Sequence, residues 1–233
     1  MKHWDAILFD LDGTLADTIE LILTCFRHTM LAHFGKVWGE AELLAGIGRP
    51  LAVQFAAFAR SDAERDAMIE TYLTRQREIH DDHVRLYPGV AEALAAIEAA
   101  SIPMALVTSK RHELAERALE RCGIRRHFGV IITPEDVTRG KPDPEPVLAA
   151  MERLGARDAA RVLFIGDSPF DIRAGNAAGV RTAAALWGPF KREALEPAAP
   201  TYWLETAGDI ARLAVQGSVP AAQSFPRTGT SIS

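Results

Sequence analysis

The chain has 233 residues, of which 48% are hydrophobic and 24% are charged, as in an ordinary soluble globular protein. This length allows one large domain, or a core domain with a smaller insertion. The formal net charge is −5 and no long basic run occurs. Nucleic-acid binding through a basic face is therefore not expected.

The two cysteines, Cys25 and Cys122, argue against a disulfide scaffold and favour a reducing compartment. Asp5, Asp10 and Asp12 interrupt the apolar stretch at the N-terminus, so it does not read as a signal peptide. No apolar run is long enough to span a bilayer. We therefore expect a cytoplasmic protein with no membrane partner.

The apolar run 6–9 predicts a buried strand, and it leads directly into the sequence DLDGT at 10–14. Burying a charge is costly unless the charge is paired or binds a metal. Asp10 and Asp12 at a strand end therefore indicate either a cation site or a nucleophile with an acid/base partner. Gly13 would allow a sharp turn or a close backbone approach. The alternative is an ordinary turn, because Asp and Gly favour turns.

The segment between Ala16 and Arg85 shows helical periodicity and no good strand pattern. A helix capped by Asp17 or Thr18 is expected to run to about Phe34. Three further helices are expected at Glu40–Ala45, Pro50–Ala59 and Asp62–His83.

From Tyr87 onward the pattern alternates between strands and helices. Strands are expected at 103–107, 130–132, 162–165 and 181–184, and helices at 89–100, 111–122, 144–154 and 171–178. This alternation predicts an α/β protein with a parallel sheet covered on both faces. The first strand joins this sheet, so residues 1–15 and 87–216 would form a discontinuous core. Residues 16–86 would form a helical insertion, and the Ser-, Pro- and Gly-rich tail 217–233 is expected to be disordered.

Polar residues follow four of the five expected strands at their carboxyl ends, where open parallel sheets bind ligands. They are Asp10 and Asp12, then Thr108, Ser109 and Lys110, then Lys141, and finally Asp167, Ser168 and Asp171. Carboxylates suit Mg²⁺, while hydroxyls, backbone amides and an ammonium suit phosphate oxygens. The set fits Mg²⁺-assisted phosphoryl transfer.

Taken singly, three of these residues have plainer interpretations. Thr108 could cap the helix near Arg111, Lys141 could be a solvated loop charge, and Asp171 could be a helix N-terminal acid. Their joint placement after successive strands favours the functional interpretation.

With these residues in this order, the chain resembles the haloacid dehalogenase-like hydrolase superfamily. The resemblance rests on DLDGT at 10–14, Thr108 at a strand end, Lys141 in KPDP, and GDSPFD at 166–171. It spans about residues 5–186, and the four motifs together are highly specific. It implies a Rossmann-like parallel-sheet core with an inserted all-helical cap domain.

The resemblance also implies catalytic roles. Asp10 would be the nucleophile and form an aspartyl-phosphate, and Asp12 would be the general acid and base. Asp10, the main-chain carbonyl of Asp12, and Asp167 would hold Mg²⁺.

Other residues would bind the substrate or support the metal site. Thr108 and Lys141 would bind the phosphoryl group with help from the Ser109 backbone. Asp171 would bind the metal through water, or orient Lys141.

The helical insertion resembles the cap of this superfamily, with hinges near 16–17 and 87–88. Arg49 and the backbone of Gly46 and Gly48 are the candidate substrate contacts, since Arg49 could pair with a carboxylate or a second phosphate. An exposed arginine in a helix-breaking loop is the alternative. The sequence HDDH at 80–83 is interpreted as a solvated helix end, because its spacing does not match a helical metal pair.

The closest resemblance within the superfamily is to phosphoglycolate phosphatases and pyrophosphatases. We therefore expect a Mg²⁺-dependent phosphatase of a small phosphorylated metabolite, with phosphoglycolate ranked first and inorganic pyrophosphate second. Asp12 disfavours a dehalogenase, because dehalogenases of this superfamily generally lack the second aspartate. A phosphomutase and a non-catalytic phospholigand-binding protein remain alternatives. Either a monomer or a homodimer is compatible with the sequence.

Overall fold

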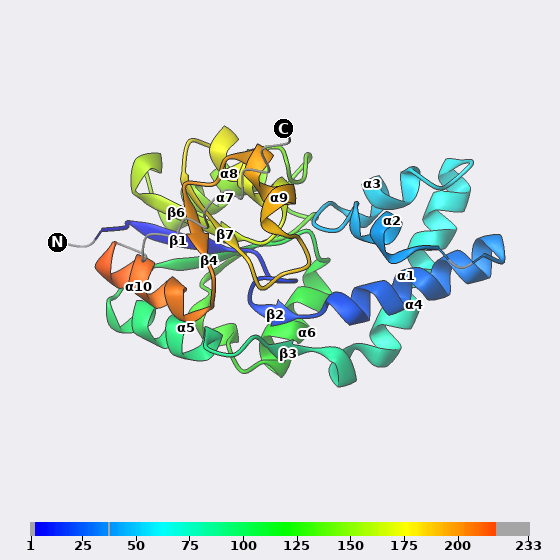
Figure 1. Ribbon diagram of the computed structural model, residues 1–233, viewed down its shortest axis with the longest axis horizontal. Coiled ribbons are helices and arrows are strands. Elements are labelled where there is room, and N and C mark those ends of the chain that lie inside the picture. The colour runs from blue at the N-terminus through cyan, green and yellow to red at the C-terminus, as the bar shows by residue number, and fades with distance from the viewer. Residues whose placement is uncertain (1–2, 37, 218–233) are drawn as a thin grey trace, which may run out of the picture.

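The protein, seen in a computed structural model that describes residues 3–36 and 38–217, is built on a six-stranded parallel sheet (Figure 1). The strand order is β5-β4-β1-β6-β7-β8. These strands are β1 (Ala6–Phe9), β4 (Met104–Val107), β5 (Val130–Ile132), β6 (Val162–Gly166), β7 (Arg181–Ala185) and β8 (Tyr202–Leu204). The predicted α/β class with a helical insertion is confirmed.

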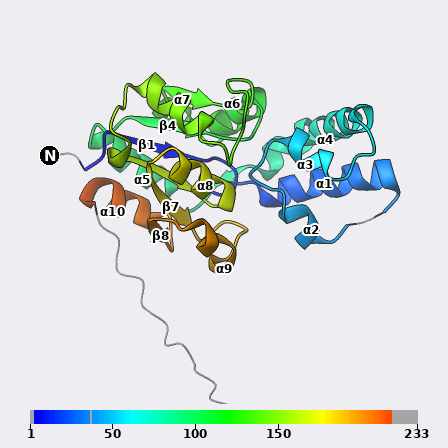
Figure 2. The ribbon, with the colours of Figure 1, turned by 90° about the horizontal axis from the view of Figure 1, so that it is seen from above.

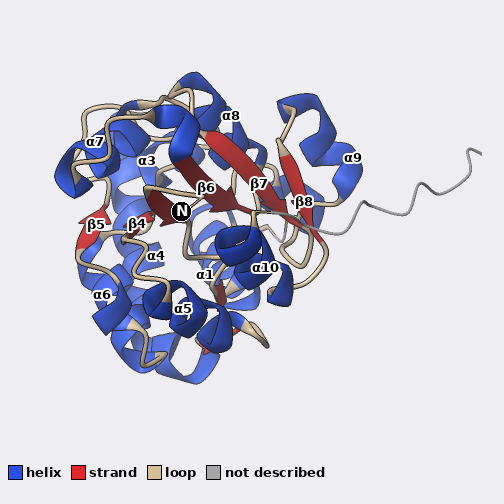
Figure 3. Cartoon of the chain, turned by 90° about the vertical axis from the view of Figure 1, so that its left-hand side faces the viewer, coloured by secondary structure: helices blue, strands red, loops and turns tan. Residues whose placement is uncertain are grey.

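Helices cover both faces of the sheet (Figure 3), because the strands carry apolar side chains on both sides. Ala6 and Leu8 of β1 pack toward α7 (Glu145–Leu154) and α8 (Pro169–Ala177). Ile7 and Phe9 belong to the core on the opposite face. That face is covered by α5 (Val90–Ala99), α6 (His112–Arg121) and α10 (Gly208–Gln216). A short helix, α9 (Arg192–Leu195), lies beyond β7.

The helical insertion lies beyond one end of the sheet (Figure 2). It comprises α1 (Ile19–Phe34), α2 (Glu40–Leu44), α3 (Leu51–Ala56) and α4 (Asp62–His83). Phe26 of α1, Phe55 of α3 and Tyr72 of α4 form its aromatic centre, with ring centroids 5.0–5.8 Å apart. The insertion therefore has apolar packing of its own, which is also continuous with the main core.

Two short strands join the insertion to the sheet domain. β2 (Ala16–Asp17) pairs antiparallel with β3 (Arg85–Leu86), in the register Ala16↔Leu86. The sequence shows no strand pattern there, because two residues are too few for a periodicity.

The structure also adds elements beyond those predicted. β8, α9 and α10 were not expected, and α8 begins two residues earlier than predicted, at Pro169. The predicted disordered tail lies outside the described residues, apart from Gly217. No helix among the described residues is long and apolar enough to cross a membrane.

Candidate functional site

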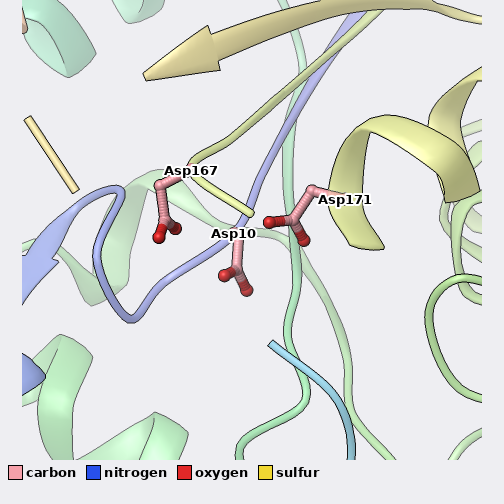
Figure 4. Close-up of side chains that lie close together, drawn as sticks. All are labelled: Asp10, Asp167 and Asp171. Carbon is pink, nitrogen blue, oxygen red and sulfur yellow. The ribbon is translucent and has the colours of Figure 1, made fainter. Parts of the chain in front are cut away.

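Three buried aspartates meet at the carboxyl ends of β1 and β6 (Figure 4). Asp10 follows β1, Asp167 follows β6, and Asp171 lies in the first turn of α8. One carboxylate oxygen from each lies within 4.8 Å of the others. The predicted convergence of these residues at one sheet edge is thus what the structure shows.

Lys141 neutralises part of this negative charge. Its Nζ donates to Asp10 Oδ1 at 2.9 Å, to Asp171 Oδ1 at 2.6 Å and to the carbonyl of Val107 at 3.2 Å. Burial alone would lower the pKa of Lys141, but the charges and hydrogen bonds of the two aspartates outweigh it and raise the pKa. The ammonium is therefore firmly charged, and it is not the solvated loop residue of the plainer interpretation.

The carboxylates carry more negative charge than Lys141 balances. Burial raises the pKa of Asp10 to about 7, although the Lys141 charge opposes the shift. Burial also raises the pKa of Asp167 well above its usual value, and the charges of Asp171 and Asp10 add to this. Such shifts indicate that the folded protein favours a further positive charge here.

A divalent cation fits this arrangement. Thr14 Oγ1 donates to Asp167 Oδ1 at 2.8 Å, but no donor among the described residues reaches the buried Oδ2. Gly13 has φ +84°, and a Cβ there would lie 2.5 Å from Asp167 Oδ2, so the loop needs its glycine. Buried hard oxygen donors without partners suit Mg²⁺.

Asp171 is already engaged by neighbouring groups. Its Oδ2 accepts hydrogen bonds from the backbone N–H and the hydroxyl of Ser168, while its Oδ1 accepts from Lys141. Of the two predicted roles, this geometry suits the orientation of Lys141.

Asp12 has partners separate from those of Asp10. Lys110 Nζ lies 2.9 Å and 3.1 Å from the two oxygens of Asp12, and Thr18 Oγ1 donates to Oδ1 at 2.7 Å. The side chain of Lys110 is only 3% exposed. The sequence places Lys110 at the sheet edge but assigns it no role, because nothing local shows that this lysine is buried.

The loop after β4 contacts the helical insertion directly. Thr108 is buried and its Oγ1 accepts the N–H of Lys110 at 3.2 Å. Ser109 Oγ donates to the carbonyl of Gly48 at 2.7 Å. The insertion is therefore seated on the sheet edge in this structure.

A cavity of about 50 Å³ lies between the insertion and the sheet edge. Since one water needs roughly 10–15 Å³ on this scale, the cavity has room for a few waters in this structure. Its walls combine polar and apolar side chains, among them Asp10, Asp12, Ile22, Ile47, Arg49, Leu51, Gln54, Tyr72, Leu73, Gln76, Thr108, Ser109, Lys110 and Asp167.

Arg49, the candidate substrate contact, lines this cavity, and so does Gln54, which the sequence analysis did not single out. Gln54 donates to the carbonyl of Arg49 at 2.5 Å, and the Arg49 guanidinium lies over the ring of Phe170. Arg49 Nε and Gln54 Oε1 are buried and find no hydrogen-bond partner among the described residues. Gly46 is not part of the lining and instead packs against these two side chains.

The predicted solvated helix end at residues 80–83 is wrong for His80, which is fully buried. Its Nδ1 lies 2.8 Å from Asp81 Oδ1, and Asp81 also binds Arg117 of α6. Within the described ranges, the three aspartates at 10, 167 and 171 are the one group of three side chains placed to share an ion.

Comparisons with known proteins agree with this geometry. The family described as haloacid dehalogenase-like hydrolase matches residues 7–185. Pyrophosphatase PpaX of Bacillus velezensis is 37% identical over 90% of this chain and 95% of its own. PpaX of Oceanobacillus iheyensis is 37% identical over 88% of this chain and 94% of its own. A predicted phosphoglycolate phosphatase from Haemophilus somnus shares the fold, with a TM-score of 0.82 at 23% identity, over 91% of this chain and 99% of its own.

Proposed function

This chain belongs to the haloacid dehalogenase-like hydrolase family, and we propose that it is a Mg²⁺-dependent phosphatase of a small phosphorylated metabolite. The observation that carries the proposal is the buried group of Asp10, Lys141 and Asp171 at the sheet edge, beside a small cavity. A carboxylate nucleophile needs a defined orientation and a nearby cation to approach a phosphoryl dianion.

In the first step, the Asp10 carboxylate attacks phosphorus and forms an aspartyl-phosphate. Asp12 would enter this step protonated and give its proton to the oxygen of the leaving group, and the resulting carboxylate would then accept a proton from the water that hydrolyses the aspartyl-phosphate. Both carboxylates are within the cavity wall, so one bound phosphoryl group can face both.

Lys141, Thr108 and the backbone N–H of Ser109 would hold the oxygens of the transferring group. Lys141 already donates to Asp10, so it can serve the nucleophile and the phosphoryl group from one position. Asp171 keeps the ammonium in that position.

Asp10, Asp167 and the main-chain carbonyl of Asp12 would hold Mg²⁺, and Asp171 would support the site from behind. When bound, the ion supplies positive charge that screens the repulsion between the carboxylate and the phosphoryl oxygens. The partnerless Oδ2 of Asp167 supports this assignment.

Residues 16–86 would act as a cap that closes over the sheet edge, with residues 1–15 and 87–216 as the catalytic core. The hydrogen bond from Ser109 to Gly48 supports this role, because it joins the two parts beside the cavity. Closure would exclude water from the phosphoryl group during transfer.

The cap would also select the leaving group. Arg49 and Gln54 have unused polar atoms in the cavity wall, which suits a second anionic group on the substrate. Inorganic pyrophosphate and phosphoglycolate both carry one. The relatives named pyrophosphatase favour pyrophosphate, whereas the motif resemblance ranks phosphoglycolate first.

The test is phosphate release from pyrophosphate, phosphoglycolate, sugar phosphates and nucleotides, each with Mg²⁺ and with EDTA. We expect Mg²⁺-dependent release dominated by pyrophosphate or phosphoglycolate, and its loss in Asp10→Asn. Rapid turnover of a sugar phosphate alone would overturn the substrate assignment. Isomer interconversion with little phosphate release would indicate a phosphomutase, and binding without turnover would indicate a phospholigand-binding protein.

A further inference from the structure

Lys110 is a second buried lysine at the site, and the reaction described above does not use it. Its ammonium contacts both oxygens of Asp12, whereas Lys141 contacts one oxygen of Asp10. A buried ammonium is costly unless it is paired and well placed. The two aspartates of the DLDGT sequence, only two residues apart, therefore each have a lysine of their own from a different loop.

The contacts of Lys110 restrict the orientation of Asp12. The Asp12 side chain is 16% exposed and faces the cavity, so it would otherwise be free to rotate. Lys110 holds both carboxylate oxygens from the core side, and Thr18, directly before α1, holds Oδ1 from the side of the helical insertion. Asp12 is thus fixed between the loop after β4 and the start of the insertion.

We propose that Lys110 is a positioning residue, which holds the Asp12 carboxyl group at the orientation in which its protonated form can give the proton to the leaving-group oxygen. The inference rests on the proposed function. Proton transfer requires the two heavy atoms to approach within about 2.6–3.2 Å. A misplacement of about 1 Å can cost on the order of 100-fold in rate.

This role differs from a merely structural one in its dependence on the leaving group. A weakly basic leaving group departs without a proton, whereas a strongly basic one needs the proton that Asp12 supplies. Loss of Lys110 should therefore slow the reactions of basic leaving groups selectively. A general disturbance of the site would slow all of them equally.

The experiment compares kcat/KM for dinitrophenyl, nitrophenyl and phenyl phosphate in the parent enzyme and in Lys110→Met, whose side chain has a similar length but no charge. We expect a loss of about 10- to 100-fold for phenyl phosphate and less than about threefold for dinitrophenyl phosphate. Asp12→Asn should show the same pattern. The double variant Lys110→Met/Asp12→Asn should lose no more than Asp12→Asn alone, because both changes remove one function.

Lys110→Arg provides a second variant in case Lys110→Met does not fold, which thermal unfolding would show. Arginine keeps the charge, but its longer planar group displaces the carboxylate. We expect a loss of roughly three- to tenfold for phenyl phosphate and none for dinitrophenyl phosphate.

An equal loss across the three aryl phosphates, or additive losses in the double variant, would overturn the role of Lys110 and leave the phosphatase assignment intact. In contrast, hydrolysis of dinitrophenyl phosphate that survives Asp10→Asn would overturn the proposed function itself, and this inference with it.

Discussion

Gly48 of the helical insertion lies against Ser168 of the sheet domain, so closely that a Cβ on Gly48 would come within 2.6 Å of the Ser168 hydroxyl oxygen. Gly48 also has φ +98°, which other residues adopt only with strain. Ser168 in turn binds Asp171, the partner of Lys141. The fit of the insertion on the sheet edge thus depends on a position without a side chain, adjacent to the buried charges.

Gly48→Ala is expected to weaken closure without unfolding the protein. The strain and the contact with Ser168 together should cost about 1–3 kcal/mol in the closed arrangement. We expect kcat/KM for the preferred substrate to fall on the order of 10-fold, measured by steady-state phosphate release. Gly129→Ala is the matched control, because nothing lies within 4 Å of a Cβ at that position. Full activity in Gly48→Ala would mean that this contact does not matter for turnover.

Asp167→Asn should leave the protein as stable as the parent, or more stable, without Mg²⁺, and less stable than the parent when Mg²⁺ is bound. In EDTA the variant should unfold at the same temperature as the parent or higher, because the substitution removes a buried carboxylate whose pKa burial raises. With Mg²⁺ at 100 times its Kd, the parent should gain about 2.7 kcal/mol and the variant little. Thermal unfolding with and without Mg²⁺ measures both effects. Asp158→Asn, at an exposed site, should respond to Mg²⁺ as the parent does, and an equal response of Asp167→Asn would exclude Asp167 as a ligand.

Lys141→Met should destabilise the fold strongly. Removing this ammonium leaves Asp10 and Asp171 buried without their shared cation, and breaking a buried ion pair costs about 3–5 kcal/mol. Urea unfolding in EDTA gives the difference in the free energy of unfolding. The exposed Lys191→Met should change it by less than about 0.5 kcal/mol. A similarly small change in Lys141→Met would show that the buried charges are not balanced as described.

His80 should make the protein less stable in mild acid. Burial lowers the pKa of His80, and the positive charges of Lys110 and Arg117 add to this, while the hydrogen bond to Asp81 opposes it. The folded state therefore binds this proton less readily than the unfolded chain, whose histidine has a pKa of about 6.5. The contribution of His80 to the free energy of unfolding should therefore be fully present above about pH 6.5 and be lost as the pH falls below that value.

Urea unfolding of the parent and of His80→Gln between mildly acidic and neutral pH tests this expectation. In the variant, the free energy of unfolding should rise less steeply with pH than in the parent. The difference in slope can reach at most ~1.4 kcal/mol per pH unit, the limit for one proton. His112→Gln, at an exposed position, is the matched control. An unchanged slope in His80→Gln would mean that His80 does not contribute.

The strands that carry the site could be predicted because they are continuous apolar runs, as buried parallel strands require. β1, β4, β5 and β6 lie where the sequence predicts them, to within a residue. The pair of β2 and β3 could not be predicted, because each has two residues and its partner lies about 70 positions away. β8 is similarly short, and its three residues are too few to show a strand pattern.

For the site, the motif residues Asp10, Lys141 and Asp167 could be located from the sequence, because each follows a recognisable strand or loop. The burial of Lys110 and Gln54 could not, since both follow from how the helical insertion is seated on the core. His80 illustrates the same limit. A run of charged residues at a helix end predicts exposure to solvent, and the sequence does not show that α6 packs beside these residues, where Arg117 contacts Asp81.

The short pairing of β2 with β3 has a mechanical consequence. The chain leaves the core at Ala16 and returns at Leu86, and these two crossings are bonded to each other. The backbone N–H of Tyr87 adds a further bond to the carbonyl of Leu15. We therefore expect a change of angle at one crossing to be transmitted to the other, and the four helices to move together about this pair of strands. A substitution in β2 or β3 would then alter the movement of the whole insertion, whereas one inside the helices would alter only the surface that the insertion presents to the site.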